Sequence, residues 1–262
     1  MRGPGRPLTF AGAAIRRLIP VAVAESGNVT VSFEILSYAI TVTITDIATG
    51  AGRDVPTVAA PAGTTSPVWS ADGRRLLMTV LRGQEGLVGF VTVDMATMRA
   101  RFTSVAHHDR YSGGFLWADR KGTTVAIQSR PSNSDAARDV TFFDLDGTVL
   151  RKLRRVGETI ETVDWLSPSG SRFVTRCPTM TSLTCVWQTA DGAPVARVTL
   201  DAADLTSWWG EDRLLGWRER TQAERVAVPI DFDDQAGGQV AAAPAGYSVA
   251  DLRLFFAPIR TG

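Results

Sequence analysis

One pattern recurs at a nearly constant interval along the chain, and it restricts the fold more than any other feature of the sequence. A tryptophan opens WSADGRRLLMTV, WADRKGTTVAIQS and WLSPSGSRFVTRC, at Trp69, Trp117 and Trp165, which follow one another at intervals of 48 residues. A fourth copy, WGEDRLLGWRER, begins at Trp209, and a degenerate first copy, VAVAESGNVTVSF, contains Gly27. Repetition at such a period indicates a protein built from one repeated structural unit.

A second marker follows the same period and defines the contents of each unit. An apolar, strand-like run ends in a polar turn at Asp46, Asp94, Asp144, Gln188 and Asp231. Each unit therefore reads as an inner strand, a tight turn, a second strand and a third strand that ends at this marker. In most copies a fourth strand follows, as in ARFTSV, VLRKLRR and PVARVTL. Four antiparallel strands in such a repeat are typical of a propeller blade.

These units predict an all-β fold, a β-propeller of about five four-stranded blades. One sheet alone cannot bury both of its faces, whereas sheets packed radially can. The pattern W-S-x-D-G-R-x-L, at residues 69–76, resembles the repeats of TolB-like propellers within the wider WD-repeat-like group. The resemblance covers roughly residues 18–260 and implies the fold. It does not imply one activity, because propellers of this kind occur in proteins with many functions.

The repeat divides the chain into an N-terminal extension, residues 1–17, and a propeller domain, residues 18–262. The expected blades are 18–66, 67–114, 115–161, 162–204 and 205–262. Such rings normally close by pairing strands from the two ends of the chain, and LRLFFAPI at 252–259 is the expected closing strand. A sixth blade composed of both ends is the alternative. We expect the repeated tryptophans to be structural, wedged between neighbouring blades, rather than to stack on a ligand.

Residues 18–24 allow two interpretations. The preceding arginines and the A-x-A-like end of LIPVAVA resemble a secretory signal. The apolar run is short, contains Pro20 and fits the first strand of the first repeat, which is the interpretation that we favour. No apolar run approaches the roughly 18 residues that a membrane-spanning helix needs, so we expect no transmembrane segment.

The two cysteines, Cys177 and Cys185, flank a loop between two strand-like runs. If the runs form a hairpin in which these residues lie opposite each other, their Cβ atoms come within disulfide distance. We favour a disulfide over two reduced thiols. A disulfide in turn favours an extracytoplasmic or cell-envelope location over the cytoplasm.

The charge balance restricts the class of partner. Lys and Arg number 28 against 27 Asp and Glu, which leaves a net charge of +1. This balance gives no argument for a nucleic acid or an anionic membrane as the partner. The hydrophobic share of 44% excludes a disordered chain and suffices for a core.

Two segments resemble sites of known chemistry. VTFFDLDGT resembles the first motif of haloacid-dehalogenase-like phosphotransferases, which would make Asp144 a nucleophile and Asp146 a general acid on Mg²⁺. Asp-Gly is also a hairpin turn, and Asp144 falls on the repeat's turn marker, so we expect a turn. The pair His107-His108 suggests a metal or acid–base site, but no further ligands show recognisable spacing, and an exposed loop is the preferred interpretation. We expect no metal and no cofactor.

The loops at one end of the blades are the expected site of function, because they vary in length and carry polar residues on a rigid scaffold. The candidate binding residues on these loops are Arg82, His107, His108, Asp109, Arg110, Tyr111, Arg130 and Glu158. Because no catalytic motif accompanies the repeats, we expect a non-enzymatic scaffold that binds a protein or another macromolecule. The alternative is a hydrolase of carbohydrate or peptide that uses Asp109, Glu158 and Asp201 near the axis.

Overall fold

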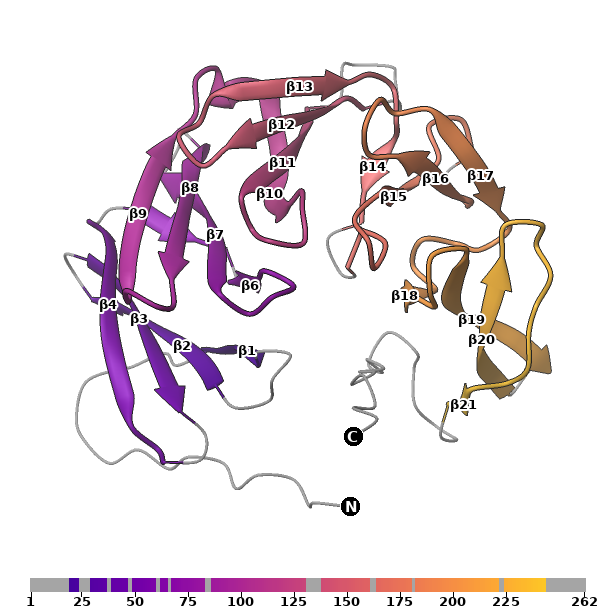
Figure 1. Ribbon diagram of the computed structural model, residues 1–262, viewed down its shortest axis with the longest axis horizontal. Helices are drawn as coiled ribbons and strands as arrows, with labels where there is room; N and C mark the ends of the chain where they lie inside the picture. Colours follow the sequence, from indigo (N-terminus) through magenta and orange to yellow (C-terminus); the bar gives the residue numbers. More distant parts are fainter. Residues whose placement is uncertain are drawn as a thin grey trace.

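The computed structural model describes most of the chain, and what it describes is almost entirely β-structure in antiparallel sheets. The described residues are 19–23, 29–36, 39–46, 49–59, 62–65, 67–82, 86–130, 138–160, 164–180, 182–221 and 224–243. Within them five sheets follow one another in chain order around a common centre (Figure 1). The all-β propeller predicted from the repeat is confirmed.

The first two sheets come from the N-terminal part of the chain. The first contains β1 (Ile19–Val23), β2 (Val29–Leu36), β3 (Ala39–Asp46) and β4 (Gly52–Ala59). The second contains β5 (Ala62–Thr64), β6 (Val68–Trp69), β7 (Arg75–Arg82), β8 (Gly86–Asp94) and β9 (Arg99–Ser104). Both β5 and β6 pair with β7, so an interrupted inner strand gives this sheet five strands.

The remaining three sheets each have four strands in chain order. The third follows the short 3-10 helix η2 (His108–Arg110) and contains β10 (Tyr111–Trp117), β11 (Thr124–Ser129), β12 (Val140–Asp144) and β13 (Val149–Leu153). The fourth contains β14 (Glu158–Thr159), β15 (Arg172–Arg176), β16 (Thr184–Gln188) and β17 (Pro194–Val198). The fifth contains β18 (Leu205–Trp208), β19 (Arg213–Thr221), β20 (Glu224–Asp231) and β21 (Ala241–Ala242).

The inner strands of the second, third and fourth sheets start several residues before the blade boundaries expected from the tryptophans, whereas β18 begins at the expected boundary, residue 205. β5 already belongs to the second sheet at residue 62, β10 begins at 111 and β14 begins at 158. β6, β10, β14 and β18 lie nearest the centre, and β4, β9, β13 and β17 lie outermost (Figure 1). The expected extension at 1–17 and the expected closing strand at 252–259 lie outside the described residues.

The core lies between neighbouring sheets rather than inside any one of them. Phe90 of the second sheet packs on Phe115 of the third, with ring centroids 4.9 Å apart, and Phe115 meets Phe143 at 6.1 Å. Buried polar groups also join the sheets. The Thr79 hydroxyl accepts the amide of Phe115 at 2.7 Å, and the Gln128 side chain accepts the amide of Thr159 at 3.0 Å. The inner strands of the third and fourth sheets are therefore each held by the sheet before them.

The repeated tryptophans contribute to these contacts between sheets. The indole of Trp117 donates to the carbonyl of Val68 at 3.0 Å, and the indole of Trp165 donates to the carbonyl of Trp117 at 2.7 Å. Both indoles are buried. The structural role predicted for these two tryptophans is confirmed.

The prediction for Trp209 is wrong. Trp69 pairs with Leu76, and in the fifth sheet the equivalent partner of the second strand, Leu214, pairs with Trp208. Trp209 lies after β18 and is 38% exposed. Two adjacent tryptophans satisfy the same spacing, and only the pairing of the strands distinguishes them.

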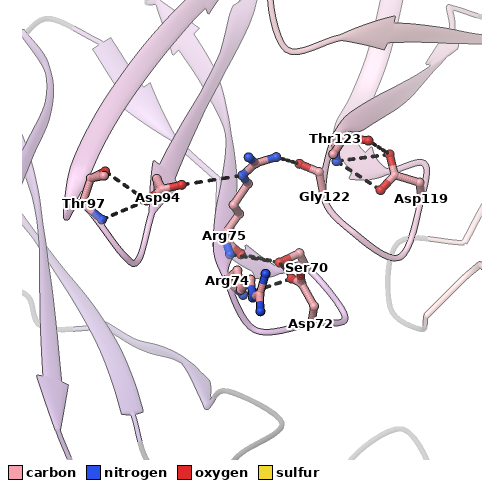
Figure 2. A network of polar contacts seen from close by, with 9 residues as sticks. All are labelled: Ser70, Asp72, Arg74, Arg75, Asp94, Thr97, Asp119, Gly122 and Thr123. Carbon is pink, nitrogen blue, oxygen red and sulfur yellow. Dashed lines mark hydrogen bonds and ion pairs between the residues drawn. The ribbon is translucent and has the colours of Figure 1, made fainter.

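The W-S-x-D-G-R motif closes a turn and ties one sheet to the next (Figure 2). The Ser70 hydroxyl donates to Asp72 at 2.7 Å and accepts the amide of Arg75 at 2.9 Å. The Arg75 guanidinium then donates to the carbonyl of Gly122, in the turn of the third sheet, at 2.7 Å. Arg172 makes the same bond to the carbonyl of Glu211, also at 2.7 Å. The most recognisable residues of the repeat are thus used for the scaffold.

Candidate binding surface

At one end of the strands, the turns and connections of the second, third and fourth sheets form a common surface, because successive antiparallel strands return to that end. We call it the loop surface. It comprises the described residues of 82–86, 105–111, 129–139, 154–158 and 176–184, which follow β7, β9, β11, β13 and β15. All eight candidate binding residues named from the sequence lie on it.

Arg130 and Tyr111 are brought together by backbone contacts between the β9–β10 connection and the end of β11. The amide of Arg130 donates to the carbonyl of Arg110 at 2.8 Å, and its Nε donates to the carbonyl of Tyr111 at 2.9 Å. The guanidinium also lies beside Gly86, where an added Cβ would be 3.6 Å from Nη2. The Tyr111 ring packs edge-on against Phe143, with centroids 5.7 Å apart. Arg130 therefore spans from the third sheet to the β7–β8 turn.

A second constellation places Glu158 between two arginines. Arg138 Nη2 lies 3.2 Å from Oε1 of Glu158, and Arg176 Nε lies 3.8 Å from Oε2. Arg138 also donates to the hydroxyl of Ser112 at 3.2 Å. The carboxylate and both guanidinium groups come from three separate segments, so this arrangement depends on the packing of the third and fourth sheets.

The residues that flank Glu158 explain why its position is so closely defined. Gly157 has φ +92°, and a Cβ added there would lie 2.1 Å from the carbonyl oxygen of Arg176. Its amide donates to the carbonyl of Arg138 at 3.3 Å. On the other side, the amide of Thr159 is held by Gln128. A residue with a side chain at position 157 would push the connection away from β15.

The structure contains the predicted disulfide between Cys177 and Cys185, with the Cα atoms 5.0 Å apart. The register used to predict it is wrong, because Cys185 lies opposite Thr175 and not opposite Cys177. Cys177 lies just beyond β15 and donates its amide to the carbonyl of Leu183 at 3.0 Å. The bridge thus holds the β15–β16 turn directly beside Arg176. At the tip of this turn, Met180 is 52% exposed.

The remaining predicted binding residues lie in the β7–β8 turn and in the β9–β10 connection. Arg82 is exposed at the end of β7, and His107 is exposed with a left-handed φ of 55°. His108, Asp109 and Arg110 form η2. For the side chains of Arg82, His107 and Asp109, the described part of the structure shows no hydrogen bond or ion pair. Among the described residues, no group of three His, Cys, Asp or Glu side chains could hold a metal ion.

Asp139 connects the loop surface to the basic strand β13. Its carboxylate accepts the amide of Arg155 at 2.9 Å and the Lys152 ammonium at 2.8 Å. Partial burial would by itself raise the pKa of Asp139, but the hydrogen bonds from Lys152 and Arg155 outweigh it and the pKa lies below its usual value. Arg151, on the same strand, stacks over Phe142 at 4.2 Å. Two of the basic side chains of β13 are therefore engaged within the molecule.

The turn predicted at Asp144 and Asp146, in preference to a phosphotransferase motif, is confirmed. β12 lies between β11 and β13 and is antiparallel to both, so Asp144 ends a strand of a hairpin. Its carboxylate accepts the amides of Asp146 and Thr148 at 2.9 and 2.8 Å, and Asp146 pairs with Arg101. Asp144 therefore stabilises its own turn, and Asp146, within that turn, pairs with Arg101 of β9.

The three carboxylates of the hydrolase alternative lie before three different sheets. Asp109 is in η2 before β10, Glu158 opens β14 between its two arginines, and Asp201 precedes β18. Asp201 accepts the amide of Ala203 at 2.9 Å and so caps its own turn.

Arg176 and Ser112 are the site residues that sequence reasoning missed. Arg176 ends β15 (172–176), outside the loops expected to bind. Ser112 lies within the expected loop 106–114 but belongs to β10 (111–117). The only available signal for Arg176 was its position next to Cys177, at the base of a turn that a disulfide would close.

Comparison with solved structures supports the propeller fold. An oligogalacturonate lyase from Vibrio parahaemolyticus matches with a TM-score of 0.60 and 12% identity, over 90% of this chain and 68% of that protein. An uncharacterised protein from Listeria monocytogenes EGD-e matches with a TM-score of 0.59 and 10% identity, over 91% and 69%. The β-propeller domain of the trilobed protease from Pyrococcus furiosus, which has an open velcro topology, matches with a TM-score of 0.53 and 14% identity, over 86% and 71%.

These similarities show the fold alone, since every identity is below 15%. The chain spans about two thirds of the length of these structures. No protein-family model and no curated protein matches the sequence. Within the described residues, no helix is long and apolar enough to cross a membrane.

Proposed function

We propose that this chain is a non-enzymatic, TolB-like propeller that binds a protein partner through its loop surface. The observation that carries the proposal is the pair of arginine constellations, Arg130 with Tyr111 and Arg138 with Glu158 and Arg176. Guanidinium groups and tyrosines are enriched among the residues that dominate protein interfaces. Here they lie at strand ends and in connections that are held by backbone hydrogen bonds, from Arg130 to Arg110 and from Gly157 to Arg138.

Rigidity supports a binding role for this surface. The disulfide restrains the β15–β16 turn, and backbone hydrogen bonds restrain both Arg130 and Gly157. A surface that is ordered before binding loses less conformational entropy when a partner arrives. The disulfide also supports the proposed extracytoplasmic or cell-envelope location, because the cytoplasm keeps most thiols reduced.

The test is a charge reversal on each end of the molecule. Arg130→Glu changes the loop surface, and Arg74→Glu changes an exposed arginine in the opposite turns. Proteins of the native cell envelope are cross-linked to wild type and to both variants, and the bound species are identified. We expect a species retained by wild type and Arg74→Glu but lost from Arg130→Glu.

Two results would overturn the proposal. One is the same set of bound species for all three proteins. The other is hydrolysis of a polysaccharide or peptide by wild type that Glu158→Gln abolishes, which would establish the hydrolase alternative instead.

A further inference from the structure

The described residues of the loop surface have an excess of positive charge that the whole chain lacks. They carry seven arginines, namely Arg82, Arg110, Arg130, Arg138, Arg154, Arg155 and Arg176, against three carboxylates, namely Asp109, Asp139 and Glu158. The full sequence has a net charge of only +1. The positive charge is therefore concentrated in the loops of the second, third and fourth sheets. The described connections of the fifth sheet at the same end instead carry Asp201, Asp204, Glu219 and Glu224 against Arg220.

The internal contacts on this surface neutralise only part of that excess. Glu158 forms ion pairs with Arg138 and Arg176. Asp139 forms an ion pair with Lys152 and accepts a hydrogen bond from the amide of Arg155. Arg82, Arg110 and Arg130 are exposed, and no described carboxylate pairs with them. Of these three, Arg130 is the most constrained, because its Nε is tied to a carbonyl and only its terminal nitrogens remain to bind a ligand.

Glu158 shows what kind of ligand this surface accepts. One carboxylate reaches two guanidinium groups at once, at 3.2 and 3.8 Å, and it remains 40% exposed. Guanidinium groups recognise planar carboxylates with paired donors. A carboxylate from a partner would meet the same geometry, in competition with Glu158 at Arg138 and Arg176 and without competition at Arg130.

From these observations we infer that the loop surface binds an acidic, extended peptide segment of its protein partner. This inference rests on the proposed function and names the chemistry of the partner. The partner's carboxylates pair with Arg130 and its exposed neighbours, and an apolar residue of the segment contacts Met180 at the tip of the disulfide-closed turn. Methionine suits such a contact because its side chain is flexible and polarisable.

An acidic peptide fits this surface better than a nucleic acid does. Single strands are held by a basic groove together with aromatic rings on which bases stack. The tyrosine here is half-buried, with its ring against Phe143.

The inference is tested by titrating the folded, oxidised protein with a fluorescent Glu/Asp-rich dodecapeptide that contains one leucine, at low salt. We expect saturable binding that weakens as salt increases, because exposed charges are screened. Arg130→Glu should weaken binding by about tenfold, since hydrogen bonds to charged groups are involved. Glu158→Gln should strengthen it by about threefold, because it frees Arg138 and Arg176. Arg74→Glu is the matched control and should leave binding unchanged.

Three outcomes overturn the inference. These are no saturable binding of the peptide by wild type, equal weakening by Arg130→Glu and Arg74→Glu, and tighter binding of a single-stranded oligonucleotide of equal charge that depends on Arg130. Near-UV circular dichroism of each variant separates a lost contact from a lost fold. If the peptide does not bind while cross-linking to a partner still depends on Arg130, the inference of an acidic peptide segment is wrong and the proposed function stands.

Discussion

The two ends of the strands use polar residues in different ways. At one end, the turns that begin at Ser70, Asp94, Asp119, Asp144 and Ser167 repeat the same arrangement, in which a short side chain accepts the amides of its own turn or of a residue just after it. We call this end the turn surface. The contacts between sheets at this end also repeat, as from Arg75 to Gly122 and from Arg172 to Glu211. At the loop surface, Arg130, Arg138 and Glu158 each contact other segments in a different way. The comparison indicates that residues following the repeat build the scaffold, and that residues departing from it are available for recognition.

The largest difference between the two surfaces is expected from two glycines with positive φ. At Gly73, on the turn surface, φ is +69° and no atom lies within 4 Å of an added Cβ, so Gly73→Ala should cost about 1–2 kcal/mol. At Gly157 the added Cβ also meets the backbone of Arg176, so Gly157→Ala should cost about 3 kcal/mol or more. Denaturant unfolding of both variants measures the difference. Equal losses of unfolding free energy in the two variants would show that the backbone around Gly157 accommodates a Cβ as easily as the open turn at Gly73 does.

A smaller effect is expected from the disulfide, which has no counterpart among the described residues of the turn surface. Cys177→Ala with Cys185→Ala should lower the free energy of unfolding by about 2–3 kcal/mol, because the unfolded chain regains the freedom of a short loop. Binding of the acidic peptide should weaken as well, since Arg176 adjoins the bridge. Wild type unfolded with a reductant present should match the variant. A double variant as stable as the oxidised wild type would contradict a stabilising role for the Cys177–Cys185 disulfide.

The smallest effect is expected from acid titration of the turn surface. Hydrogen bonds from the Thr97 amide and hydroxyl hold the pKa of Asp94 below its usual value. A carboxyl group whose pKa is lower in the folded state stabilises the fold above its unfolded pKa, and this contribution is lost as pH falls through the folded pKa. Thermal unfolding of Asp94→Asn should therefore show a deficit at neutral pH that shrinks in the acid range below about pH 4.

The matched control for this titration is Asp109→Asn on the loop surface. The side chain of Asp109 has no hydrogen bond or ion pair among the described residues, so its replacement removes no such contact. A pH-dependent deficit as large as that of Asp94→Asn would remove the distinction between the two surfaces.

The sequence predicted the turns correctly where one residue type recurs because its side chain accepts hydrogen bonds from nearby backbone amides. The turn markers Asp46, Asp94 and Asp144 accept the amides of their own turns, so each is decided within a few residues of chain. It failed where the pairing register matters. A shift of one residue in the fourth copy exchanged Trp208 for Trp209, and a shift in the β15–β16 hairpin placed Cys177 opposite Cys185.

The amino-acid sequence by itself determined the repeated four-stranded unit, the turns that separate its strands and the pair of cysteines that join. These follow from periodic burial and from the local hydrogen bonds of short polar side chains. Only the tertiary structure decided that Ser112, Arg138, Glu158 and Arg176 meet. They belong to segments brought together by the packing of one sheet against the next, and no spacing along the chain encodes that contact.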